Sequence, residues 1–237
     1  GEDDLLEAWK AEWTIAGFEP KVLTLKDAKK HSFFPRMERF VEPKFGTGYN
    51  AMCLYRWLAM AASGGGWMCD YDTFPTNFPM NEARKLPSNG KLTSFEFHVP
   101  SLVSGTAEEW SRVAKKLIRV MPKVEEEIKS DMHAFEVIRK EGSRHQVDFR
   151  EAKLNMREGF LYKEAFSSDL PREVDCEAMA TGRAVHLAHR YTHESFDRGM
   201  FPLPRVKDYR TAFRHRGEAA RVFMADWRDQ CGGSNVK

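Results

Sequence analysis

The stretch 50–72 constrains the fold more than any other part of the chain. Its first part, 50–62, is rich in Ala, Leu and Met and predicts a buried helix. Three consecutive glycines at 64–66 end this helix. Residues 67–69 then form a short apolar run that is typical of a buried strand. A buried helix followed at once by a buried strand indicates an α/β domain.

The rest of the chain continues this alternation of helices and strands. We expect helices at 5–15, 106–120, 124–139 and 208–229, and strands at 22–25, 92–99 and 184–187. Residues 31–47 and 73–89 contain several proline residues, so we expect irregular structure there. A length of 237 residues suffices for one large α/β domain or two small ones. We favour a single domain spanning residues 1–237, truncated at its N-terminus because the chain does not begin with methionine.

Charge and apolar patterning exclude several classes of protein. The formal net charge is only +2, which argues against a protein that binds nucleic acid by neutralising phosphates. The longest apolar stretch, 51–69, is interrupted by Arg56 and by the three glycines, so we expect no transmembrane segment. We expect a soluble domain, and the sequence leaves both the cytoplasm and the Golgi lumen open as its location.

The four cysteines give a second indication of class. They lie far apart, at 53, 69, 176 and 231, and none belongs to a C-x-x-C pair, which disfavours a structural zinc site. Their spacing is unlike the framework of a small disulfide-rich domain. Two disulfide bridges in an oxidising compartment stay open as an alternative.

Asp70 and Asp72 are the residues whose chemistry stands out. They follow the predicted strand 67–69 directly, and ligands of open α/β sheets bind at the carboxyl ends of strands. Two neighbouring carboxylates repel each other when both are ionised. A hard divalent cation removes this repulsion and prefers oxygen ligands. The pair therefore predicts a metal site.

The whole run resembles the DXD sugar-binding region of GT-A-fold glycosyltransferases. The shared elements are a helix with Arg56, the pair Gly65-Gly66, an apolar strand, and the D-x-D of Asp70 and Asp72. The resemblance implies a single GT-A-like, Rossmann-like mixed sheet flanked by helices. It also implies transfer of a hexose from a UDP- or GDP-sugar to a hydroxyl group of a glycan, lipid or protein. Mn²⁺ or Mg²⁺ would bridge the carboxylates and the donor diphosphate.

The resemblance also assigns roles to individual residues. Asp72 would bind the metal directly, whereas Asp70 would contact the donor ribose or sugar, or reach the metal through water. Arg56 would lie near the donor, and the two glycines would let the helix, strand and donor approach closely. Many relatives carry an aspartate three positions before this arginine, and here that position is Cys53. A surface or salt-bridging arginine is the alternative for Arg56.

A late histidine often completes the metal site in the resembled enzymes. His186, inside the predicted strand 184–187, fits that role best, and His189 is the second choice. Imidazole is a reasonable ligand for Mn²⁺ beside two carboxylates. The alternative is that these are ordinary polar histidines of a loop or core.

A catalytic base is required if the reaction inverts the configuration of the sugar. Asp131 is the candidate, although a carboxylate at the start of a predicted helix also serves as a cap. Glu96, in the predicted strand 92–99, is a rival for the same role.

Two other functions use the same residues differently. A metal-dependent phosphoryl hydrolase or nucleotidyltransferase would direct the carboxylates at phosphorus. A catalytically inert module would bind the sugar nucleotide and perform no chemistry.

Overall fold

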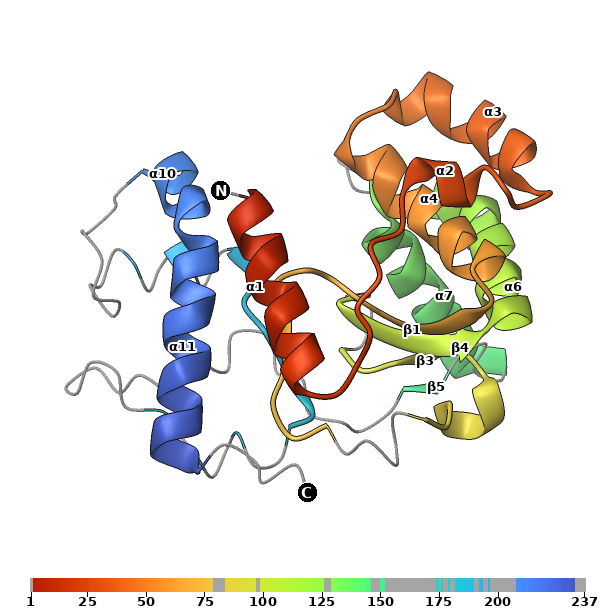
Figure 1. The fold of residues 1–237 in the computed structure, drawn as a ribbon. Coiled ribbons are helices and arrows are strands. Elements are labelled where there is room, and N and C mark those ends of the chain that lie inside the picture. The colour runs from red at the N-terminus through yellow and green to blue at the C-terminus, as the bar shows by residue number, and fades with distance from the viewer. Residues whose placement is uncertain are drawn as a thin grey trace. The chain divides into compact units, whose positions relative to one another are not determined.

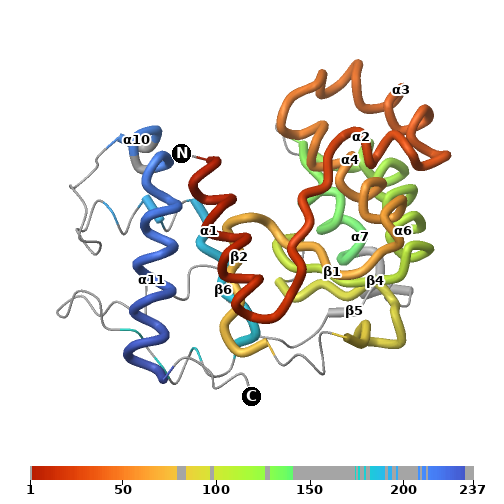
Figure 2. Tube along the Cα trace, in the orientation of Figure 1, coloured from red at the N-terminus to blue at the C-terminus, as the bar shows by residue number. Residues whose placement is uncertain are grey.

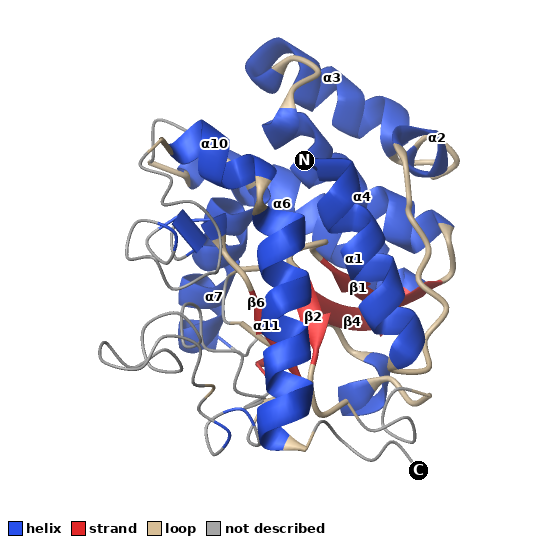
Figure 3. Ribbon diagram, turned by 60° about the vertical axis from the view of Figure 1, so that its left-hand side comes forward, coloured by secondary structure: helices blue, strands red, loops and turns tan. Residues whose placement is uncertain are grey.

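The chain forms two compact units, shown in a computed structural model (Figures 1 and 2). The structure describes residues 2–78, 84–96, 99–125, 129–145, 150–151, 174, 176, 179, 182–189, 192–193, 196 and 208–232. Unit 1 draws on residues 1–20, 70–83 and 154–237, and unit 2 on residues 21–69 and 84–153. Each unit combines helices with a small sheet, so the predicted α/β class is confirmed (Figure 3).

Unit 2 is built around a layer of helices with a shared apolar core. Its helices are α2 (Leu25–Ala28), α3 (Phe34–Phe45), α4 (Tyr49–Ala62), α6 (Ala107–Val120) and α7 (Asp131–His145), with 3-10 turns at Pro87–Gly90 and Met121–Lys123. The rings of Trp110 and Phe135 lie 5.1 and 5.4 Å from that of Trp57, and all three side chains are fully buried. Burial of three large rings in one cluster joins α4, α6 and α7 through apolar contacts.

A four-stranded sheet belongs to the same unit. Its order is β1-β4-β3-β5, with β1 (Gly65–Cys69), β4 (Leu102–Thr106), β3 (Thr93–Ser94) and β5 (Arg150–Glu151). β4 pairs antiparallel with both β1 and β3, whereas β3 and β5 are parallel, so the sheet is mixed. β4 runs directly into α6, whose N-cap Thr106 accepts a hydrogen bond from the backbone N–H of Glu109.

Gly65 is required by this packing. Its φ is +77°, and a Cβ atom placed there would lie 2.5 Å from the backbone nitrogen of Ala107 and 2.7 Å from the carbonyl oxygen of Gly105. The neighbouring Gly66 has a φ of +113°, but a Cβ atom placed there would meet only open space. The first glycine therefore lets β1 approach the β4–α6 junction, whereas the second is needed only for its backbone angle.

Unit 1 pairs the first and last described helices of the chain. Its elements are α1 (Glu2–Ile15), β2 (Thr73–Pro75), β6 (Ala184–His186), α10 (Tyr209–Arg214) and α11 (Arg216–Cys231). α1 lies beside α11 (Figures 1 and 2). Two ion pairs link these helices, Arg221 with Asp4 and Arg228 with Glu12.

A two-stranded antiparallel sheet joins distant parts of unit 1. β2 pairs with β6 in the register that sets Thr73 opposite His186. The indole Nε1 of Trp13 donates a hydrogen bond to the carbonyl oxygen of Thr73 at 2.9 Å, which ties α1 to β2. Phe74, which lies opposite Val185 in this sheet, is fully buried. This sheet sets Thr73, the residue after Asp72, opposite His186.

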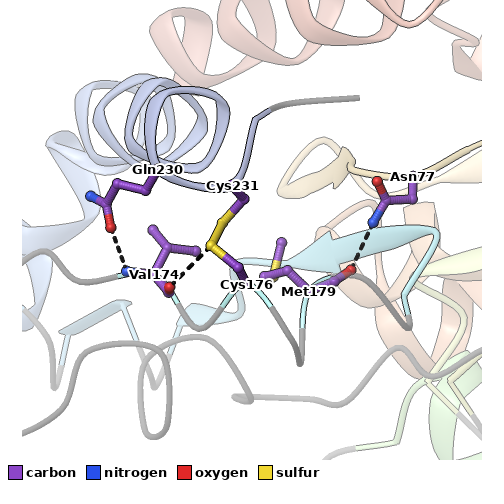
Figure 4. The surroundings of a disulfide bond; sticks show 6 residues. All are labelled: Asn77, Val174, Cys176, Met179, Gln230 and Cys231. Atoms are coloured by element: carbon purple, nitrogen blue, oxygen red, sulfur yellow. Dashed lines mark hydrogen bonds between the residues drawn. A yellow bond between two sulfur atoms is a disulfide. The ribbon is translucent and has the colours of Figure 1, made fainter. Parts of the chain in front are cut away.

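A disulfide bond closes the C-terminal part of unit 1 (Figure 4). Cys231, at the end of α11, is bonded to Cys176, whereas Cys53 and Cys69 of unit 2 are not part of a disulfide bond. Beside the bond, the side-chain oxygen of Gln230 accepts a hydrogen bond from the backbone of Val174 at 2.8 Å. Of the alternatives left open by the spacing of the cysteines, one bridge is therefore present.

Some predicted elements are wrong, each for an identifiable reason. The strand expected at 22–25 is absent from this described stretch, and α2 begins there instead because Thr24 and Asp27 form a capping box. The irregular segment 31–47 contains α3, since Pro35 lies in the first helical turn, where no backbone N–H is needed. The expected loop 73–89 begins with β2.

The later helices also differ from expectation in their bounds. The helix expected at 124–139 begins only at Asp131, and the one at 208–229 is divided into α10 and α11. Among the described residues, every helix is too short or too polar to cross a bilayer.

Candidate metal centre

Three of the predicted metal ligands converge in unit 1. Asp70, Asp72 and His186 each offer a ligand atom, and these atoms lie within 4.8 Å of one another. The pairing of β2 with β6 produces this convergence, because Asp72 immediately precedes β2 and His186 is the last residue of β6. The backbone N–H of Leu187 also donates to the carbonyl oxygen of Asp72 at 2.7 Å, which extends the pairing to the site itself.

Asp72 is the buried centre of the cluster. Only 6% of the residue is exposed, and its two carboxylate oxygens face different partners. Oδ1 lies 3.4 Å from Nε2 of His186, whereas Oδ2 forms an ion pair with Nη2 of Arg216. Asp70 is only partly buried. The site therefore has a closed side at Asp72 and a more accessible side at Asp70.

The surroundings keep Asp72 ionised despite its burial. Burial alone would raise the pKa of this carboxyl group, because desolvation disfavours the charged form. The interactions with His186 and with the positive charge of Arg216 outweigh that effect and hold the pKa of Asp72 well below its usual range. A cation that binds here therefore does not have to displace a proton from Asp72.

His189 approaches the cluster through Arg216. Its Nε2 lies 3.9 Å from Oδ2 of Asp72 and 3.1 Å from Nη1 of Arg216. Burial and the nearby positive charge of Arg216 lower the pKa of His189 to about 4, so its imidazole is neutral at pH 7. Because all nitrogens of Arg216 carry hydrogen, Nε2 of the neutral ring accepts this hydrogen bond. His189 thus contacts the arginine and lies outside the three-residue cluster.

Arg216 is the residue of this site that the sequence did not single out. Its residue exposure is 3%, and its guanidinium also lies over the ring of Phe213, 4.8 Å from the centroid. Its Nε is buried without a hydrogen-bond partner. In the sequence it is one of many basic residues in the segment 183–216, and nothing in their spacing distinguishes the buried arginine from the exposed ones.

The donor set fits a divalent cation. Two carboxylates and one imidazole are ligands that Mn²⁺ accepts, and carboxylates are the usual protein ligands of Mg²⁺. The cluster contains two carboxylates, those of Asp70 and Asp72, and one guanidinium, that of Arg216, so the charge balance favours binding of a cation. The partly exposed Asp70 leaves one side on which the cation could also be reached from solution.

Arg56 and Asp131, predicted for donor binding and catalysis, contact each other in unit 2. Oδ2 of Asp131 lies 2.9 Å from Nε and 2.8 Å from Nη2 of Arg56, and it also accepts a hydrogen bond from the indole of Trp57 at 2.8 Å. Oδ1 accepts from the backbone N–H of Met132 at 2.9 Å. These contacts make Asp131 the anchor between the start of α7 and the middle of α4. Its role as a general base stays a prediction.

The remaining predicted residues also lie in unit 2. Gly65 and Gly66 open β1, and Gly65 is explained by its packing against the β4–α6 junction. Glu96, the rival base, is 2% exposed and accepts a hydrogen bond from the hydroxyl of Ser101. The candidate residues are thus divided between the two units, and the metal ligands are all in unit 1.

Comparison with known proteins places the chain in a family. Residues 1–179 match the family described as "Domain of unknown function (DUF8765)", and the chain belongs to this family. No curated protein and no solved structure matches the chain.

Proposed function

We propose that this member of the DUF8765 family is a metal-dependent glycosyltransferase with a GT-A-like organisation. It transfers a hexose from a nucleoside-diphosphate sugar, with UDP or GDP as the nucleotide, to a hydroxyl group of a glycan, lipid or protein. The observation that supports this most is the convergence of Asp70, Asp72 and His186, because it joins a D-x-D pair to a histidine from a distant part of the sequence.

The residues of the cluster have two different roles: some bind the cation on the buried side, and one lies where the donor would bind. Asp72 and His186 form the buried side, and the low pKa of Asp72 keeps its carboxylate ready to bind a cation. Asp70 forms the accessible side, where the diphosphate of the donor would be met. A divalent cation held by these residues supplies Lewis-acid stabilisation of the negative charge that develops on the departing nucleoside diphosphate.

A thermal melt with UDP or GDP, each with and without Mn²⁺, tests this proposal. A ligand present at 100 times its dissociation constant stabilises the folded state by about 2.7 kcal/mol. For a domain of this size, a stabilisation of about 2.7 kcal/mol raises the melting temperature by roughly 5–10 °C. We expect the increase with only one of the two nucleotides, and only when Mn²⁺ is present.

Asp70→Asn is the sharpest variant for this test. Asp70 is partly exposed, so its loss should remove a metal ligand and leave the fold intact. Loss of Asp72 would instead leave Arg216 buried without its counter-ion, and a general loss of stability would confuse the result. Asp229→Asn, an exposed carboxylate on α11, is the matched control and should keep the full response.

Four outcomes bear on the proposal and its rivals. Metal-dependent stabilisation that Asp70→Asn abolishes supports a sugar-nucleotide site, and release of nucleoside diphosphate from a sugar nucleotide in the presence of acceptor identifies transfer. Release of pyrophosphate from a nucleoside triphosphate would instead indicate a nucleotidyltransferase. Binding without turnover of any donor would indicate an inert module, and no response to either nucleotide would contradict the proposal.

A further inference from the structure

We propose that Arg216 determines which cation the centre accepts, by occupying one oxygen of Asp72. Asp72 then offers a single oxygen, Oδ1, and the centre selects Mn²⁺ or Mg²⁺ over Ca²⁺. This inference rests on the metal site of the proposed function, but it does not depend on sugar transfer.

The two oxygens of Asp72 are already distinguished by their neighbours. Oδ2 is paired with Nη2 of Arg216, and Oδ1 lies on the side of His186, with Nε2 at 3.4 Å. A carboxylate can bind a cation through both oxygens only if both are available. Arg216 removes one of them, so Asp72 acts as a ligand with one point of attachment.

The guanidinium is held in place by several further contacts. Nη1 lies 3.1 Å from Nε2 of His189, and Nη2 lies 3.5 Å from the carbonyl oxygen of Leu187. The ring of Phe213 covers one face of the guanidinium. A rotation away from Asp72 would leave a buried arginine without its counter-ion, which is strongly unfavourable. The contact with Oδ2 is therefore expected to persist when a cation binds at Oδ1.

The cations differ in the number and kind of ligands they require, so this geometry favours some of them over others. Ca²⁺ takes six to eight oxygen ligands and commonly uses both oxygens of a carboxylate. Mg²⁺ requires octahedral geometry with fewer, closer ligands, and it retains several waters. One oxygen from Asp72 and an imidazole from His186 form a poor set for Ca²⁺ and a suitable one for Mn²⁺.

Competition of Ca²⁺ with Mn²⁺, followed by the electron paramagnetic resonance signal of free Mn²⁺, measures this selectivity without any substrate. The quantity of interest is the ratio of the Ca²⁺ and Mn²⁺ dissociation constants. Removal of a positive charge strengthens the binding of both divalent ions, and this common effect cancels in the ratio. We compare the wild type with Arg216→Met, and with Arg228→Met as the matched control.

Arg228 is suited to this control because it belongs to the same helix and also pairs with a buried carboxylate, that of Glu12. We expect the wild type and Arg228→Met to bind Mn²⁺ at least about tenfold more tightly than Ca²⁺. We expect Arg216→Met to lower the ratio by about tenfold, within the range by which groups behind the ligands affect metal sites. An unchanged ratio in a folded Arg216→Met, as judged by circular dichroism, would overturn the proposal.

Infrared difference spectra of the wild type give a second measurement that needs no arginine variant. Carboxylate stretches separate differently when one or both oxygens bind a metal, and subtraction of the spectrum of Asp72→Asn, after circular dichroism has shown this variant to be folded, isolates this residue. One-oxygen binding of Mn²⁺ supports the role of Arg216, and two-oxygen binding overturns it. Absence of Mn²⁺ binding in the wild type would instead remove the metal site of the proposed function, and the inference would fall with it.

Discussion

The two units each bury an aspartate against an arginine, yet the two carboxylates are engaged differently. In unit 2, both oxygens of Asp131 accept hydrogen bonds from protein donors, among them Arg56. In unit 1, Arg216 pairs with one oxygen of Asp72, and the other faces His186, in a cluster that also includes Asp70. A buried carboxylate whose hydrogen bonds are satisfied stabilises a fold, whereas one that faces other metal ligands can hold a cation.

The units also differ in what holds them together. Unit 2 has a contiguous apolar core around Trp57. Unit 1 adds to its apolar contacts a disulfide bond and the ion pairs of α11 with Asp4, Glu12 and Asp72. The metal ligands thus lie in the unit with covalent and ionic links between distant segments, and these links fix the positions of residues from three parts of the chain.

Reduction of the disulfide should have the largest effect, and it should be confined to unit 1. The bond joins residues 55 positions apart, and the loop-entropy relation gives a loss of about 4 kcal/mol in stability on reduction. Hydrogen exchange of peptides from each unit, with and without a reductant, measures the two units separately. Cys53→Ser tests for an effect of the Cys53 thiol of unit 2. Equal loss of protection in both units would break the distinction between them.

Asp131→Ala should weaken unit 2 by about 3 kcal/mol, because it leaves Arg56 and the indole of Trp57 without their acceptor. Chemical denaturation measures the loss. Lys140→Gln, which removes a surface ion pair on the same helix, should change stability by less than about 1 kcal/mol. Affinity for Mn²⁺ should stay unchanged in Asp131→Ala. A parallel loss of Mn²⁺ binding would show that the carboxylate of unit 2 also serves the metal centre.

Gly65→Ala and Gly66→Ala form a matched pair within one strand. Both substitutions force a residue with a side chain into positive φ, which costs about 1–3 kcal/mol. Gly65→Ala also drives a methyl group into the backbone of β4 and α6, so we expect it to be worse by about 2 kcal/mol. Melting temperatures of the two variants test the difference. Equal effects would mean that the close approach of β1 to this junction is not needed for stability.

The smallest of these effects should come from acidification, which removes the contribution of Glu109 to the stability of unit 2. The hydrogen bond from Arg112, and to a smaller extent the one from the backbone N–H of Leu92, hold the pKa of Glu109 below the ordinary value of 4.5. A carboxyl group with a lowered folded-state pKa stabilises the protein above its unfolded pKa, and this contribution is lost as pH falls through the folded value. Denaturation of wild type and Glu109→Gln from pH 6 to about pH 3 should show a shallower loss in the variant. A steeper loss in the variant would contradict this sign.

Local patterns were sufficient for much of the secondary structure. The high content of Ala, Leu and Met in residues 50–62 and the apolar run before Asp70 predicted α4 and β1, and the helix expected at 106–120 matches α6 closely. These features depend on neighbours in the sequence, so they can be recognised without a structure. The expectations for 31–47 and 73–89 are wrong because proline is accepted in the first turn of a helix and at the edge of a sheet, so it does not by itself indicate a loop.

The sequence by itself determined the D-x-D pair, the chemistry of its carboxylates and a set of histidines that could join them. The sequence also ranked His186 above His189, but only the tertiary structure showed how the two differ, because the pairing of β2 with β6 sets the imidazole of His186 beside Oδ1 of Asp72, while Arg216 occupies the other oxygen. It likewise brought Arg56 to Asp131. These pairings depend on contacts between residues far apart in the chain, and such contacts cannot be predicted from patterns among neighbouring residues.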